Sequence, residues 1–171
     1  MWDSSGNDVL VRVEGTNVPS SARHPRRIGL VGCVRTKSEL PRPAQDLYLS
    51  PLFLGRRRFV EHSCDEWWIL SALHGLVHPD VVLAPYDVAL KDKGRAERRE
   101  WSSRVLADID GRGSFAAGGA VEFHAGSEYR DFGLADGLER RGWEVVNPTK
   151  GMAIGQQLAF YRNFTDNPSA A

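Results

Sequence analysis

Short apolar runs alternate with longer amphipathic segments along most of the chain. The runs occur at residues 28–33, 67–70, 120–124 and 143–146. Each run has the length of a buried strand. Helical patterns lie between them, and in residues 93–109 the side chains of Trp101, Val105 and Ile109 recur every four positions. This alternation predicts an α/β fold, a three-layer sandwich with a central, largely parallel sheet.

The length of the chain fits one domain. With 171 residues, of which 42% are hydrophobic, it can bury a single substantial core. We expect residues 27–164 to form one α/β catalytic domain. Residues 1–26 are expected to be an N-terminal extension in which residues 9–14 add an edge strand, and residues 165–171 to be a flexible tail.

Composition narrows the functional classes. The 22 basic and 22 acidic residues balance, so net charge gives no evidence for a polyanion partner. Two cysteines are too few for a disulfide scaffold or a four-cysteine zinc site, and phosphate-binding-loop, dinucleotide-binding and H-E-x-x-H motifs are absent, so we expect neither metal nor cofactor. No apolar run approaches the roughly 20 residues of a membrane helix. A monomeric cytoplasmic protein without membrane contact is the expectation.

Polar residues follow three of the apolar runs. Residues 33–37 follow the first, Ser71 and His74 follow the second, and residues 124–130 contain the end of the third. Because the carboxyl ends of parallel strands meet at one edge of a sheet, we expect these residues to line one crevice. Hydroxyl, imidazole and cationic groups suit the binding of a polar ring or phosphate and the activation of water.

Three residues are candidates for catalysis. His74 is a candidate donor to a departing base, although a histidine hydrogen-bonded in a turn explains it equally well. Asp87, which follows Tyr86, and Asp46, near Tyr48, are candidates for orienting water while the aromatic ring stacks on a base. Each aspartate is also a normal turn-capping residue.

The remaining candidates form a base pocket and a phosphate-binding surface. The base-pocket residues are Cys33, Arg35, Thr36, Tyr48, Ser71, Tyr86, His124 and Gln156. Cys33 is also a weaker candidate nucleophile, with small buried cysteine as the common alternative. The phosphate-binding candidates are Lys37, Arg56, Arg57, Arg58 and Arg130. The three consecutive arginines lie in a helix expected at residues 52–63, where a merely solvated face is the alternative.

Several of these motifs together resemble a known group of proteins. They are Gly32-Cys33-Val34-Arg35-Thr36-Lys37, the segment from Ala44 to Phe53, the Ile69 to Val77 segment, and Pro85-Tyr86-Asp87. Over residues 27–161 the chain is similar to bacterial and phage domains of unknown function related to YaaA, the peroxide-stress protein. Where that group usually has lysine after the serine-alanine pair, this chain has Leu73-His74, so the resemblance assigns His74 no shared role.

The resemblance implies a fold like that of uracil-DNA glycosylases and a relationship to bacteriophage-inhibiting DNA glycosylases. The leading hypothesis is therefore a DNA glycosylase that hydrolyses the N-glycosidic bond of a modified, flipped-out base, in defence against phage. One alternative is an N-glycosidase or glycosyl transferase acting on free nucleosides or nucleotides. The other is a non-enzymatic DNA-binding stress protein that uses the basic helix and not the pocket.

Overall fold

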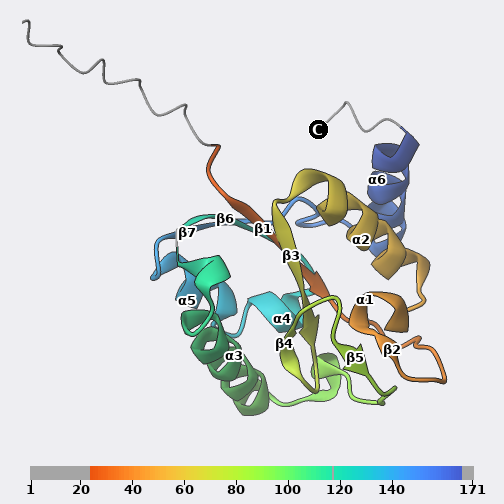
Figure 1. The fold of residues 1–171 in the computed structure, drawn as a ribbon, viewed down its shortest axis with the longest axis horizontal. Coiled ribbons are helices and arrows are strands. Elements are labelled where there is room, and N and C mark those ends of the chain that lie inside the picture. Colours follow the sequence, from red (N-terminus) through yellow and green to blue (C-terminus); the bar gives the residue numbers. More distant parts are fainter. Residues whose placement is uncertain (1–23, 117, 167–171) are drawn as a thin grey trace, which may run out of the picture.

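A five-stranded sheet forms the centre of the molecule in the computed structural model, which describes residues 24–116 and 118–166 (Figure 1). The strand order is β4-β3-β1-β6-β7. Strands β1 (Arg27–Gly32), β3 (Glu66–Ser71), β6 (Gly119–His124) and β7 (Trp143–Val146) run parallel, and only the edge strand β4 (Gly75–Val77) is antiparallel to its neighbour. The predicted α/β architecture with a largely parallel sheet is confirmed.

Helices cover both faces of this sheet (Figure 1). Helices α2 (Pro51–Ser63) and α6 (Ile154–Asp166) pack together on one face. Helices α3 (Arg95–Asp110) and α5 (Leu134–Glu139) cover the other, with the short α4 (Ser127–Arg130) after β6. The glycines of β1 show how closely both faces of the sheet are covered. A methyl group on Gly29 would meet Val60 of α2, and one on Gly32 would meet Ala125 and Tyr129.

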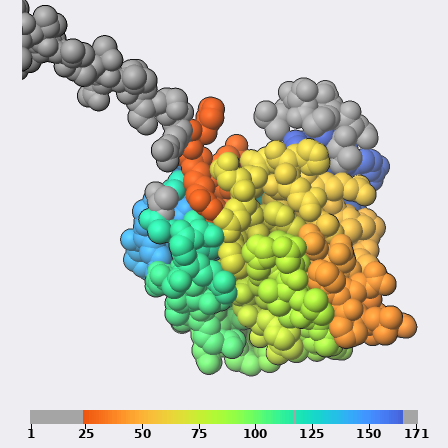
Figure 2. Space-filling model, viewed as in Figure 1, coloured from red at the N-terminus to blue at the C-terminus, as the bar shows by residue number. Residues whose placement is uncertain are grey.

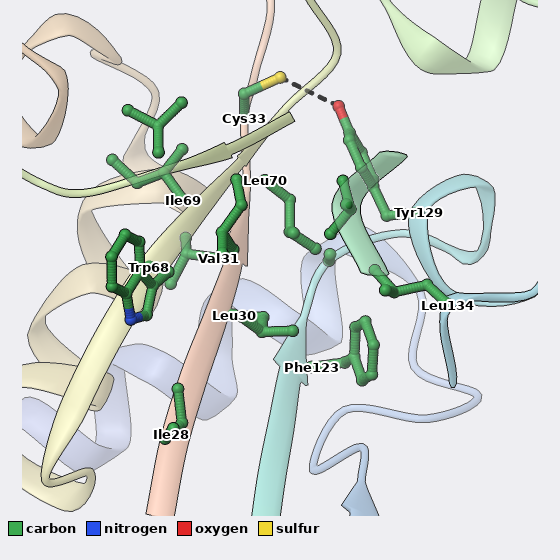
Figure 3. Close-up of a cluster of buried hydrophobic side chains, with 14 of the residues drawn as sticks. Ile28, Leu30, Val31, Cys33, Trp68, Ile69, Leu70, Phe123, Tyr129 and Leu134 are labelled. Atoms are coloured by element: carbon green, nitrogen blue, oxygen red, sulfur yellow. Dashed lines mark hydrogen bonds between the residues drawn. The ribbon is translucent and has the colours of Figure 1, made fainter. Parts of the chain in front are cut away.

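Burial on both faces explains why the strands are continuously apolar. Ile28, Leu30 and Val31 of β1 are fully buried, and Leu30 lies close to Phe123 of β6 in the core (Figure 3). Helix α2 begins where the sequence provides a start signal: Pro51 occupies the first turn and the Ser50 hydroxyl accepts a hydrogen bond of 3.1 Å from the Phe53 amide.

Short elements complete the fold. They are β2 (Arg42–Pro43), α1 (Ala44–Leu47), β5 (Val82–Leu83) and the 3-10 turns η1 (Leu90–Asp92) and η2 (Gly113–Phe115). β2 pairs antiparallel with β5, and the segments that contain them lie side by side on the surface, orange and yellow-green in Figure 2. No helix among the described residues combines the length and apolarity needed to cross a membrane.

The structure corrects some expected boundaries. Residues 67–77 form a hairpin, since Gly75 takes a positive φ of 73° and the chain folds back as β4. Residues 165 and 166, expected in a tail, continue α6. The strand predicted at residues 9–14 lies outside the described residues.

The strand order creates a switch point between β1 and β6. From β1 the chain passes through α2 to β3 on one side, whereas from β6 it passes through α4 and α5 to β7 on the other. The loops beyond these two strand ends therefore diverge to opposite faces of the sheet. Open α/β sheets bind ligands at this position, so it is the first place to look for a site.

Candidate active site

The segments beyond the carboxyl ends of β1, β3 and β6 meet as the sequence predicted. Cys33, directly after β1, contacts the Tyr129 hydroxyl of α4 with its sulfur at 3.0 Å (Figure 3). The same sulfur accepts a hydrogen bond of 3.4 Å from the backbone amide of Ala72, after β3. Cys33 therefore joins all three strand ends at the switch point.

A chain of hydroxyl groups extends from this junction. The Tyr86 hydroxyl lies 2.7 Å from the Tyr48 hydroxyl and 2.7 Å from Ser71 Oγ. Ser71 Oγ also accepts a hydrogen bond of 3.0 Å from the backbone amide of His74, and the Trp101 indole donates to the Ser71 carbonyl at 2.9 Å. These contacts fix the position of Tyr86, whose segment lies outside the main sheet.

The phenols in this region remain protonated at neutral pH. Burial is the largest cause that raises the pKa values of Tyr48, Tyr86 and Tyr129 above their ordinary range, and the nearby Cys33 adds to it. The hydroxyl chain is therefore a set of neutral hydrogen-bonding groups.

Lys37 and Asp87 provide the charges beside this chain. The Lys37 ammonium lies 4.3 Å from the centroid of the Tyr86 ring and donates a hydrogen bond of 3.3 Å to the Arg35 carbonyl. Burial lowers the pKa of Lys37, while the nearby Cys33 and then the negative charge of Asp87 partly oppose this shift. Asp87 is exposed, and within the described part of the chain its carboxylate has no hydrogen bond or ion-pair partner. A carboxylate and an ammonium are thus available to a ligand together.

Three other predicted residues lie at the rim. His74 is exposed, with its ring edge-on to Tyr86 at 5.3 Å between centroids. Arg35 is exposed and paired with Asp92 at 2.8 Å, and Thr36 is exposed beside it. His74 also borders a hollow of about 360 Å³ against α3, which extends the rim toward Trp101 and Arg104.

Four predicted site residues have other positions and roles. Tyr48 is fully buried, so its ring is not available to stack on a base. Asp46 points away and pairs with Arg57 at 2.7 Å. The Gln156 side chain caps α6 by accepting a hydrogen bond of 2.8 Å from the Ala153 amide. His124 is fully buried between β6 and the α2–α6 layer.

The structure does not place the predicted phosphate-binding arginines together on one exposed surface. Arg56 is only 6% exposed and donates to Gln157 at 3.0 Å, so it does not project from α2 as expected. Arg57 is half-buried and bound by Asp46 and Glu61. Arg130 pairs with Asp131 at 2.6 Å. Arg58 is exposed as predicted, at the edge of a hollow of about 340 Å³ between α2 and α6.

His124 belongs to a buried polar network on the α2–α6 face. Its Nδ1 lies 2.8 Å from the Tyr161 hydroxyl and its Nε2 lies 3.2 Å from the fully buried Glu122 carboxylate, which Arg27 also binds. A neutral ring that accepts at Nδ1 and donates from Nε2 satisfies both contacts. Burial, followed by the charges of Arg56 and Arg27, lowers the pKa of His124 to about 3.

This shift predicts a pH-dependent stability. In the unfolded chain His124 binds a proton near its ordinary pKa of about 6.5, whereas the folded protein excludes the proton until about pH 3. Acid therefore favours unfolding, and His124 should remove about 2 kcal/mol of stability between pH 7 and pH 5. Urea unfolding at the two pH values measures this loss. His124→Asn should flatten the dependence, and an NMR titration showing the folded ring protonating near pH 6 would contradict it.

Sequence reasoning missed several residues that organise this region. Tyr129 lies in the predicted 124–130 segment but was not singled out, yet its hydroxyl contacts the Cys33 sulfur. Trp101 was assigned to a buried stripe, and its indole hydrogen bond was not predictable from that spacing. Glu122 gave a signal, because it lies two residues before His124 and therefore on the same face of the strand. Among the described residues no group of three side chains is arranged to hold a metal ion.

Comparison with known proteins identifies a protein family for this chain but gives no activity. A family model described as "Family of unknown function (DUF6884)" matches residues 28–163. The chain is also 37% identical over 78 residues to the uncharacterized protein YfjM of Bacillus subtilis (strain 168). That alignment covers 41% of this chain and 51% of YfjM, so the chain spans about half the length of this relative.

Proposed function

Because this chain belongs to the DUF6884 family, whose function is unknown, we propose a function from the chemistry of Lys37, Tyr86 and Asp87: hydrolysis of the N-glycosidic bond of a modified nucleobase in DNA. The carrying observation is an unengaged carboxylate, Asp87, close enough to influence the part-buried ammonium of Lys37, which lies beside the Tyr86 ring. The resemblance to YaaA-related domains supports the same reaction and a fold of the uracil-DNA-glycosylase kind. A role in phage defence is part of this proposal.

The two charged groups take complementary roles. Asp87 accepts a proton from the attacking water and stabilises the positive charge that develops on the sugar as the C1′–N bond breaks. The water oxygen forms the new bond to C1′. Lys37 donates a proton to the departing base, and its lowered pKa makes it a better acid than an ordinary lysine. No redox partner or cofactor enters this balance.

The neighbouring side chains position these groups. Tyr86 lies under the Lys37 ammonium, and its own hydroxyl is held by Tyr48 and Ser71. His74 at the rim, edge-on to Tyr86, contacts the base or sugar as the flipped nucleotide enters. The buried Tyr48 acts through Tyr86 and does not touch the substrate.

The proposal is tested by incubating the purified protein with heavily modified phage DNA and with unmodified DNA, followed by alkali. Alkali cleaves abasic sites, so strand breaks confined to the modified DNA are expected. Release of base from mononucleotides and not from DNA would favour the nucleotide glycosidase instead. A folded protein that yields no breaks and no free base with either substrate would refute the glycosidase.

Lys37 also predicts the alkaline side of the pH–rate profile. Because its pKa is lowered by burial, loss of its proton should reduce base release at a pH below its ordinary value of 10.5. Lys37→Arg keeps the charge at all accessible pH values and should remove this decline, while lowering the rate because the donor is displaced. An unchanged alkaline limb in Lys37→Arg would assign the limb to another group.

A further inference from the structure

A second polar hollow lies between α3 and the segment that joins α4 to α5. Its volume is about 370 Å³, and its lining includes three exposed arginines, Arg95, Arg99 and Arg140. Within the described residues, none of the three guanidinium groups has a carboxylate partner. Three uncompensated cations around one hollow form a local positive patch on a chain whose net charge is zero.

Ser102, whose hydroxyl group is buried, is one of the residues that line the same hollow. Ser102 is 1% exposed, and its Oγ has no hydrogen-bond partner among the described residues. A buried polar atom without a partner costs stability, and most such atoms in folded proteins are satisfied. The Oγ atom is covered in the structure, so a ligand oxygen would supply the missing partner once the wall of the hollow opens slightly to admit it. The hydroxyl therefore indicates a ligand independently of the arginines.

The lining also contains carboxylates, which limit what can bind. Asp131 is neutralised by Arg130 at 2.6 Å, whereas Asp136 faces the hollow without an ion-pair partner in the described chain. Three unpaired arginine charges outnumber the one unpaired carboxylate, so the hollow favours an anion. The negative charge of Asp136 weakens that preference. An anion with several oxygen acceptors fits three guanidinium groups and one hydroxyl.

An aromatic ring in the lining of the hollow favours a nucleic-acid strand over a free anion as the ligand. Phe132 lines the hollow, with the Arg98 guanidinium 4.8 Å from its ring centroid. Aromatic rings interspersed with cations are typical of surfaces that hold single strands, where bases stack and phosphates pair. The hollow also lies next to α4 in the chain, and Tyr129 of α4 contacts Cys33 at the end of β1, so the hollow belongs to the same end of the sheet as the candidate site.

We propose that the hollow between α3 and the α4–α5 segment binds backbone phosphates of the DNA strand whose target base lies beside Lys37 and Asp87, through Arg95, Arg99, Arg140 and the Ser102 hydroxyl. This inference rests on the proposed glycosidase for the identity of the strand. The phosphate chemistry itself rests only on the groups that line the hollow.

The test measures binding of a fluorescent, unmodified single-stranded oligonucleotide to the full chain by anisotropy at several salt concentrations. Arg99→Gln should weaken binding by about tenfold at low salt and reduce the slope of log affinity against log salt by about 0.7. The matched control Arg162→Gln removes an exposed arginine from α6, on the opposite face of the sheet, and should leave both quantities unchanged. Asp136→Asn should tighten binding.

Ser102→Ala separates ligand binding from folding. Since Oγ has no internal partner, the variant should keep or raise its melting temperature and yet bind the oligonucleotide several-fold more weakly. Parental affinity in both Ser102→Ala and Arg99→Gln would overturn the proposal. If both variants bind the strand normally but bind inorganic phosphate, titrated alone, more weakly than the parent protein does, the hollow serves a small phosphate compound and the strand assignment is wrong.

The result of the oligonucleotide-binding test does not depend on whether the protein releases a base. Unmodified DNA presents no substrate, so strand binding that depends on Arg99 supports the hollow even if the parent protein releases no base from modified DNA. That combination would refute the glycosidase alone. Base release that persists with Arg99-independent binding would refute the hollow alone.

Discussion

Asp87→Asn is expected to lower the rate of base release by about 10²–10⁴-fold, the usual contribution of a general base. The amide retains the shape of the side chain but neither accepts the proton of water nor stabilises a positive sugar. Because Asp87 is exposed and forms no internal hydrogen bond in the described residues, the free energy of unfolding should not change. Single-turnover base release and urea unfolding measure the two quantities.

Asp46→Asn is the matched control. In the sequence both aspartates lie near a tyrosine and a turn, but in the structure Asp46 forms an ion pair with Arg57, whereas Asp87 has no such partner among the described residues. Its replacement should leave the rate of base release unchanged and cost at most about 1 kcal/mol of stability. A large loss of rate in Asp46→Asn with a parental rate in Asp87→Asn would reverse the assignment of the catalytic carboxylate.

Arg27→Met is expected to destabilise the fold by about 3–5 kcal/mol at neutral pH. Glu122 is fully buried, and removal of Arg27 leaves its carboxylate with only the neutral ring of His124 and the more distant thiol of Cys64. An uncompensated buried charge is costly because desolvation is no longer offset. Urea unfolding of the parent and variant at the same pH measures this loss.

The double variant tests the cause of this loss. Arg27→Met combined with Glu122→Gln removes the buried charge together with its partner, and it should be more stable than Arg27→Met alone. If the double variant loses the sum of the two single effects, Arg27 stabilises the fold through packing of its methylene groups and not through the ion pair.

The parallel part of the fold was predictable because its strands are apolar on both faces. β1, β3, β6 and β7 lie close to the predicted runs, and their order along the chain fixed which loops could meet. β4 has three residues and β2 and β5 have two each, so none has a period to detect. These elements form only because tertiary contacts stabilise them.

The prediction that Arg56 projects outward from α2 was wrong, and helix geometry gives the reason. Arg56 lies three residues after Phe53 and three before Phe59, both buried, so all three share the inner face of α2. The run of three arginines suggested one surface, but consecutive helical residues point in different directions. Only Arg58 of the three is exposed.

The convergence of the site was predictable, whereas the roles within it were not. Parallel topology brings Cys33, Ser71 and Tyr129 to one region, since the ends of β1, β3 and β6 share an edge, whereas Asp87 lies in a segment outside the main sheet. Whether a given side chain is buried, paired or unengaged depends on partners distant in sequence. Tyr48 and Tyr86 are 38 residues apart, and their contact decides that one is a buried support and the other a half-buried neighbour of Lys37.

The most direct test of the central claim is chromatographic detection of free base after the parent protein acts on modified phage DNA. We expect one modified base released for each alkali-sensitive site, with release reduced at least about 100-fold in Asp87→Asn and unchanged in Asp46→Asn. Equal release by Asp87→Asn and the parent protein would contradict the assignment of Asp87 as the general base. The absence of any released base from folded parent protein would contradict the reaction itself.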